Sequence, residues 1–142
     1  MTDNFVGFSP SPKADPDRQL VGREFSITSQ MSIRDGLSLI VTESGMAPWL
    51  GEFQKFDFRQ GAKLKYSIDG EAFGATFALI QVPKRIVLVT ESLGEADFRF
   101  KELKNGFELN VTVKMALLDS QVAKWSKAID SLEHYFRSET VG

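Results

Sequence analysis

The chain has 142 residues, a length typical of one domain, and carries 17 Lys and Arg against 19 Asp and Glu, for a formal net charge of -2. This balance argues against nucleic-acid binding through phosphate neutralisation, which requires a strongly basic face. Because the chain has no cysteine and a single histidine, His134, it lacks the residues for disulfides, thiol nucleophiles and zinc sites built from Cys or several His.

No segment has the pattern of a membrane span or a secretory signal. The longest nearly apolar stretch covers residues 72–80 and is far shorter than the roughly 18 residues that cross a bilayer. The first residues lack a basic region followed by a long apolar one. We therefore expect a cytoplasmic protein without a membrane span.

The first 22 residues differ in composition from the rest of the chain. Three of the five prolines, Pro10, Pro12 and Pro16, lie there among serines and aspartates. Proline fixes φ and removes amide donors, which disfavours both helix and sheet. We predict a flexible Pro-rich arm over residues 1–22, in which Phe5 and Phe8 could dock on a surface, and a single domain over residues 23–142.

The domain opens with a strand and a short helix. Apolar and polar residues alternate from Arg23 to Ser29, which predicts a strand with one solvated face. Ser32 is a candidate N-cap for a helix. The helix is predicted from apolar residues that share one face: Ile33, Leu37, Ile40 and Val41. We expect it to stop at Gly45, with another short turn over residues 46–50.

A series of strands follows, separated by turn signals. Asp69-Gly70 is typical of a two-residue hairpin turn, and Asn105-Gly106 is a second hairpin signal. Short turns join antiparallel neighbours, so the middle of the chain is predicted to be a meander. The predicted strands cover residues 53–59, 63–68, 71–82, 86–90, 96–103 and 107–115.

The C-terminal part is predicted to be one long amphipathic helix that packs on one face of the sheet. Asp119 or Ser120 is the candidate N-cap. Its apolar stripe consists of Val122, Trp125, Ile129, Leu132 and Phe136.

This order of elements resembles the helix-grip fold, and local motifs resemble one family within it. Residues 47–50 and 57–62 are similar to the Trp-Leu segment and the Asp-x-Arg-x-Gly-Gly turn of START-like proteins. Gly74 with residues 82–90, and Trp125 with Leu132, resemble two further motifs. Together they cover about residues 23–138 and resemble the group related to the activator of the heat-shock chaperone ATPase, in the SRPBCC (Bet v-type) superfamily.

The resemblance implies an α+β fold in which a curved antiparallel meander wraps around the C-terminal helix, with an apolar cavity between them. The sequence leaves open whether Phe side chains fill this cavity. The predicted ligand-binding residues lining it are Trp49, Tyr66, Phe77, Leu88, Phe98, Leu109, Val111, Trp125, Ile129 and Leu132.

Several of these residues, and others, have a structural interpretation beside the functional one. Trp125 could be a core anchor with a hydrogen-bonded indole, and Trp49 either core or a lid. Glu133, on the flank of the helix stripe, could bind a ligand amine or act as a general base, or be a solvated charge; Ser126 shares that flank. His134 projects away from the stripe and is expected to be a solvated surface residue.

Lys63, Lys65 and Tyr66 interleave basic and aromatic residues, as in proteins that bind single-stranded nucleic acid. Alternation along a strand places the lysines and Tyr66 on opposite faces, so this pattern does not predict a stacking platform.

The leading functional hypothesis is therefore a domain that binds a small hydrophobic molecule, such as a lipid, polyketide or aromatic compound. It requires no metal, cofactor or catalytic residue. One alternative is a protein-interaction module like the chaperone ATPase activator domain, in which the arm contributes. Another is a cyclase- or dehydrase-type enzyme, which would require an acid–base pair inside the cavity. The oligomeric state is left open.

Overall fold

The structure is a computed structural model that describes residues 17–141. Most of the predicted arm, including Phe5 and Phe8, lies outside the described residues. The first strand begins at Arg18 and not at Arg23, because residues 18–22 continue the pairing with the last strand of the sheet, Arg18 opposite Leu118.

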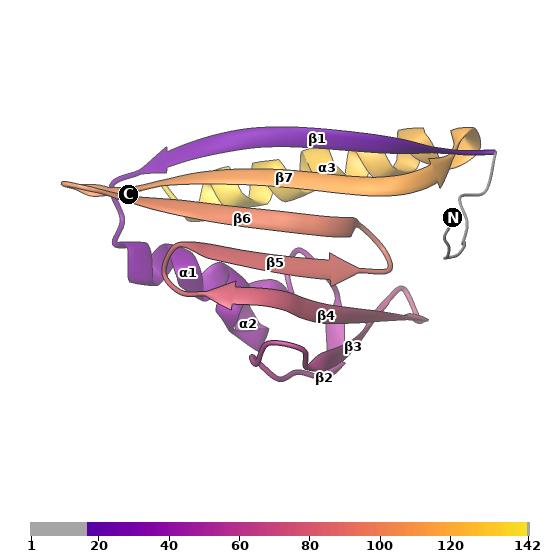
Figure 1. The fold of residues 1–142 in the computed structure, drawn as a ribbon, viewed down its shortest axis with the longest axis horizontal. Coiled ribbons are helices and arrows are strands. Elements are labelled where there is room, and N and C mark those ends of the chain that lie inside the picture. The colour runs from indigo at the N-terminus through magenta and orange to yellow at the C-terminus, as the bar shows by residue number, and fades with distance from the viewer. Residues whose placement is uncertain (1–16, 142) are drawn as a thin grey trace, which may run out of the picture.

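The elements follow the predicted order, and Figure 1 shows their arrangement. The strands are β1 (Arg18–Ser29), β2 (Glu52–Lys55), β3 (Lys63–Ile68), β4 (Glu71–Gln81), β5 (Arg85–Thr90), β6 (Gly94–Leu103) and β7 (Gly106–Leu118). The helices are α1 (Ile33–Val41), α2 (Glu43–Met46) and α3 (Asp119–Glu139).

All seven strands form one antiparallel sheet in the order β1-β7-β6-β5-β4-β3-β2. The meander from β2 to β7 is the predicted one, and β1 joins its end by pairing with β7 over its whole length. At the first hairpin signal, Asp69 and Gly70 both adopt positive φ, 51° and 85°. Asp-Gly tolerates this backbone conformation, which explains why the chain reverses there.

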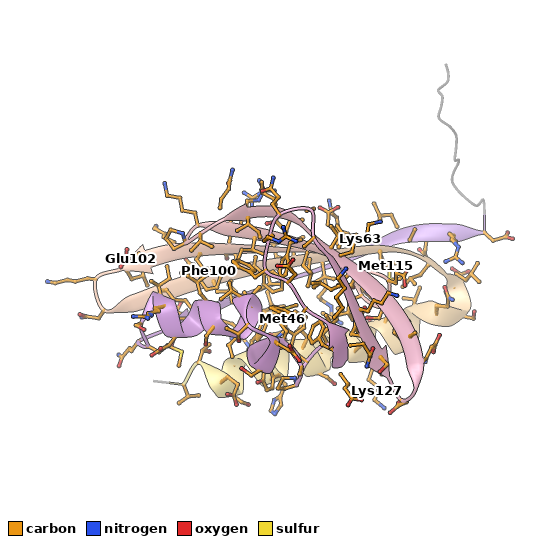
Figure 2. The ribbon with its side chains drawn as sticks, turned by 90° about the horizontal axis from the view of Figure 1, so that it is seen from below. Met46, Lys63, Phe100, Glu102, Met115 and Lys127 are labelled. Atoms are coloured by element: carbon orange, nitrogen blue, oxygen red, sulfur yellow. The ribbon has the colours of Figure 1, made fainter. Side chains whose placement is uncertain are left out.

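The three helices lie on the same side of the sheet (Figures 1 and 2). Helix α3 runs along β1 and β7 and buries the predicted stripe, with Trp125, Ile129, Leu132 and Phe136 buried and Val122 half-buried. The inner face of the sheet and the helices together enclose one continuous apolar core. The fold is thus α+β, a curved antiparallel sheet around a C-terminal helix, as the sequence predicts.

Besides the start of β1, three further local predictions are wrong. Helix α1 ends at Val41 because the Thr42 hydroxyl accepts from the Gly45 amide and starts α2, so Gly45 lies inside a helix. Strand β2 ends at Lys55, after a bulge between Phe53 and Lys55 that interrupts its pairing with β3, so residues 56–59 are not a strand. Neither Asp119 nor Ser120 caps α3; the N-cap is Leu118, whose amide donates to Gln121 Oε1.

Candidate functional site

The ten residues predicted to line a cavity all lie in or against the core between the sheet and the helices. Nine are buried, and Trp49, in the turn after α2, is half-buried. They come from β3 to β7 and from α3, so the fold brings residues distant in sequence to one interior. Among the described residues, Tyr66 is the one ionisable side chain buried in this interior.

Both tryptophans use their indole N–H groups within the protein. Trp125 Nε1 donates to the Leu93 carbonyl at 3.0 Å, which confirms the core-anchor interpretation of this residue. Trp49 Nε1 donates to the Leu39 carbonyl at 2.9 Å, while its ring packs on Phe98 and Phe136. The end of the interior beside Phe136 is therefore filled by aromatic rings.

Tyr66 forms the polar end of the interior. Its hydroxyl lies 2.6 Å from Ser92 Oγ, and the Ser92 amide donates to it at 3.3 Å. Burial raises the pKa of Tyr66, an effect that the hydrogen bonds with Ser92 partly offset. The phenol is therefore neutral at physiological pH and can exchange hydrogen bonds, but it cannot supply a charge.

Four half-buried phenylalanines lie beside this polar end and were not singled out from the sequence. We name them the aromatic rim: Phe53, Phe56, Phe58 and Phe73. Phe53 and Phe73 contact Tyr66, and Phe56 and Phe58 meet the Phe77 ring edge-on, with centroids 6.2 and 5.0 Å apart. In the strand predicted over residues 53–59, Phe53 would lie on the opposite face from Phe56 and Phe58, so the sequence pattern does not predict that the three rings come together.

The turn that resembles the family's Asp-x-Arg-x-Gly-Gly motif fixes one side of this rim. Asp57 pairs with Arg59, which lowers the pKa of Asp57. Beyond it, the Gly61 amide donates to the Phe77 carbonyl, and Gln60 Oε1 accepts from the Ile80 amide. These bonds flank the bulge that interrupts β4 between Phe77 and Leu79. The motif therefore has a structural role here: it attaches the loop carrying Phe56 and Phe58 to β4.

The candidates for acid–base chemistry lie outside the interior. Glu133 forms an ion pair with Arg137 one helical turn later, and Arg137 also donates to the Ser26 carbonyl on β1. The Ser126 hydroxyl accepts from Arg23, and His134 is exposed. Glu133, Ser126 and His134 therefore fit the structural interpretation, that of polar residues on the outer flank of the helix.

The structure also contains an open groove, of about 860 Å³, on the opposite, outer face of the sheet. It lies over β2 to β5, where register places Val89, Thr76 and Lys63 in one row and Gly74, Lys65 and Lys55 in the next. In Figure 2, Lys63 lies on the side of the sheet away from the helices. The groove is separated from the predicted cavity by the sheet itself.

Within residues 17–141, no helix is both long and apolar enough to cross a membrane.

Comparison with known proteins identifies the fold. No protein-family model and no curated protein matches the chain, whereas several solved structures do. An uncharacterised protein from Rhizobium leguminosarum is 12% identical with a TM-score of 0.70, covering 87% of this chain and 95% of its own. The Aha1 dimer of Colwellia psychrerythraea is 15% identical with a TM-score of 0.64, covering 86% of this chain and 98% of its own.

A third similar structure is DynU16, a protein from the dynemicin biosynthetic locus. It is 12% identical with a TM-score of 0.64; the match covers 82% of this chain and 46% of DynU16. At these identities the likeness concerns the fold alone. The chain has a helix-grip fold.

Proposed function

We propose that this chain binds a small apolar molecule in the interior between the sheet and α3, and that the molecule enters through the aromatic rim. One observation carries the proposal: an interior lined by apolar side chains, with neutral Tyr66 as its one buried ionisable group among the described residues, is bordered by four phenylalanines that are only half-buried. These four rings are the side chains that a molecule entering at the polar end of the interior would have to move.

Burial of hydrocarbon surface would drive this binding. At about 25 cal/mol per Å² of apolar surface removed from water, a lipid, polyketide or aromatic compound can bind without a charged partner. Aromatic rings occupy part of the interior, so a ligand has to displace rim side chains such as Phe56 and Phe58. The Tyr66–Ser92 pair offers one hydrogen bond to a hydroxyl or carbonyl group of the ligand. A pocket of this kind selects poorly among apolar compounds of similar size.

The resemblance to the group related to the chaperone ATPase activator supports a second candidate, a protein-interaction module. The specific observation for it is Leu20, which is 72% exposed at the start of the edge strand β1, next to the arm. An enzyme of the cyclase or dehydrase type is less well supported, because Glu133 is ion-paired with Arg137 on the flank of α3.

The first test is native mass spectrometry of the purified protein with solvent extraction of any bound compound, followed by titration with the neutral fluorophore Nile red. We expect a bound compound or a blue-shifted, saturable signal. Phe56→Ala should speed uptake of the fluorophore by opening the rim, whereas Leu20→Ala, on the distant β1, should leave the rate unchanged. A protein that carries no compound and does not bind the fluorophore would contradict the proposal.

The interaction hypothesis has a separate test. The full chain and a chain beginning at Asp17 are compared in pull-downs; residues 18–22 are kept because they pair with β7. Loss of a partner on removal of the arm favours an interaction module, and absence of any partner for both chains argues against it.

A further inference from the structure

We infer that the groove on the outer face of the sheet is a second binding site, which takes a small amphipathic organic anion with an apolar body and a carboxylate or phosphate head. The sheet lies between this site and the interior, and Phe73 of the aromatic rim is the residue of that rim that also borders the groove. Its volume of about 860 Å³ falls in the range of about 300–1,000 Å³ that is usual for small-molecule pockets.

The positive charge of the groove comes from Lys55, Lys63 and Lys65. All three side chains are exposed, and none forms an ion pair within the described part of the chain. The acidic residue of the groove, Glu91, lies at the opposite side, at the end of β5, where its carboxylate accepts from the Gly74 amide at 2.6 Å. An anionic head is therefore attracted to the β2–β3 side, away from Glu91.

Two of these lysines are placed where they destabilise the sheet. Lys55 and Lys65 are directly opposite each other on β2 and β3, and like charges at directly opposed positions repel. The repulsion is removed when an anion lies between the two ammonium groups. The Asp57 carboxylate, which is paired with Arg59, also interacts electrostatically with Lys55 but does not line the groove. Local features that lower stability are expected at functional sites.

The floor of the groove shows a second feature of this kind. Gly74 lies inside β4, where glycine weakens a strand. It has no positive φ, it is not at the β4 bulge, and the nearest atoms that a Cβ there would meet belong to the Glu91 carboxyl group, at an ordinary 3.6 Å. The Glu91 carboxylate borders Gly74 on the β5 side, and the missing side chain leaves room for a ligand to approach the backbone of β4.

The groove can also hold an apolar body. Beside Gly74, its lining includes Ala72, the methyl-bearing Thr76 and Val89, which is 42% exposed. These side chains are short, so a flat or chain-like apolar group reaches the floor while its head remains beside the lysines. This combination of an apolar floor and one charged wall defines the chemical class of the ligand.

The test uses 2-naphthoate and 2-naphthyl phosphate as anionic probes and 2-naphthamide as the neutral probe of the same shape. Binding is followed by ¹⁵N-¹H NMR on the full chain. We expect both anions to shift the amides of Gly74, Lys65 and Val89 and to bind at least about tenfold more tightly than the amide, with affinity falling as salt screens the lysines. The head group that binds more tightly identifies the ligand as carboxylate or phosphate.

Two variants with matched controls test the residues. The triple variant Lys55→Gln, Lys63→Gln, Lys65→Gln should lose about tenfold or more in affinity, whereas the equally charged control Lys101→Gln, Lys104→Gln, Lys127→Gln should change it by less than about twofold. Gly74→Val should abolish binding by filling the floor; Gly22→Val, at an outward position of β1 with similarly ordinary Cβ contacts, should not.

The proposal is overturned if the amide binds as well as the anions, if the shifts map to the interior, or if Gly74→Val leaves affinity unchanged. Tighter binding of an acidic peptide than of either anion would overturn the small-molecule assignment and indicate a protein partner. The effect of Phe56→Ala on Nile red uptake reports on the interior, and the lysine and Gly74 variants report on the groove. Failure of the groove site therefore leaves the proposed function standing, and failure of the proposed function leaves the groove site standing.

Discussion

At the scale of single residues, contacts in the core can reverse what local propensity predicts. Gly36 is buried in α1, where alanine would ordinarily be more favourable by about 1 kcal/mol. However, a Cβ at this position would lie 2.4 Å from Cζ of Phe107, a ring that is fully buried and packed against Phe100. The glycine allows the helix to lie directly on this ring.

We therefore expect Gly36→Ala to lower the free energy of unfolding, by about 1–3 kcal/mol, because the ring cannot move without strain. Urea denaturation measures the effect. The control is the same substitution combined with Phe107→Leu, which relieves the clash, so the added alanine should cost less there than in the wild type. An increase in stability for Gly36→Ala alone would contradict the packing described here.

Asp97 is half-buried, and two arginines hold its carboxylate. Burial raises the pKa of Asp97, but hydrogen bonds from Arg85 and Arg99 outweigh this effect, and the pKa lies below its ordinary value of 3.8. Arg85 binds both carboxylate oxygens, at 3.1 and 2.9 Å, from the neighbouring strand β5. The lowered pKa means that the folded state prefers the ionised form.

The contribution of Asp97 should be fully present above the pKa of the unfolded chain, near 4, and should be lost as the pH falls through the lower folded pKa. At pH 7 we expect Asp97→Asn to reduce the free energy of unfolding by about 1 kcal/mol. The gap between variant and wild type should shrink toward zero in acid. Asp130→Asn, which removes a more exposed ion pair with Arg23, serves as the control and should have a smaller effect. If the difference in free energy of unfolding between Asp97→Asn and the wild type did not change with pH, the charge of Asp97 would not be its cause.

At the scale of elements, the hydrophobic periodicity of the sequence correctly predicted the helices and strands whose surroundings are uniform along their length. The α3 stripe and the alternation in β7 are long, and each packs against one continuous surface, so the pattern in the sequence is sufficient. Strand β2 is shorter than predicted because the residues after it belong to a loop that hydrogen bonds of Gln60 and Gly61 attach to β4. Such bonds join residues about twenty positions apart, and no local pattern contains them.

The same distinction separates what could be predicted of the two candidate sites. The interior residues were identifiable because each lies on the apolar side of a strand or helix. The groove was not, because it depends on the pairing of Lys55 with Lys65 and of Lys63 with Thr76, which only the register supplies. In the sequence, Lys63 and Lys65 appeared as a solvated face and Gly74 as one residue of a family motif.

At the scale of the whole molecule, the two ends of the sheet differ in how firmly they are held. Strand β7 pairs with β1 over residues 107–118 and with β6 over residues 106–114, and it lies against α3. Strand β2, in contrast, is a short edge strand bordered by half-buried rings. Regions with few buried contacts open at lower free energy than the core. The aromatic rim therefore belongs to the part of the molecule that opens most easily.

Native-state hydrogen exchange should show this difference directly. We expect the backbone amides of β7 to exchange near the rate of global unfolding, and those of β2 and the following loop to exchange much faster through local opening. If the interior binds an apolar ligand through the rim, saturation with Nile red should slow exchange in β2 and leave β1 unaffected relative to β7. Equal protection of β2 and β7 in the free protein would mean that the rim does not open, and a ligand could then reach the interior only by global unfolding.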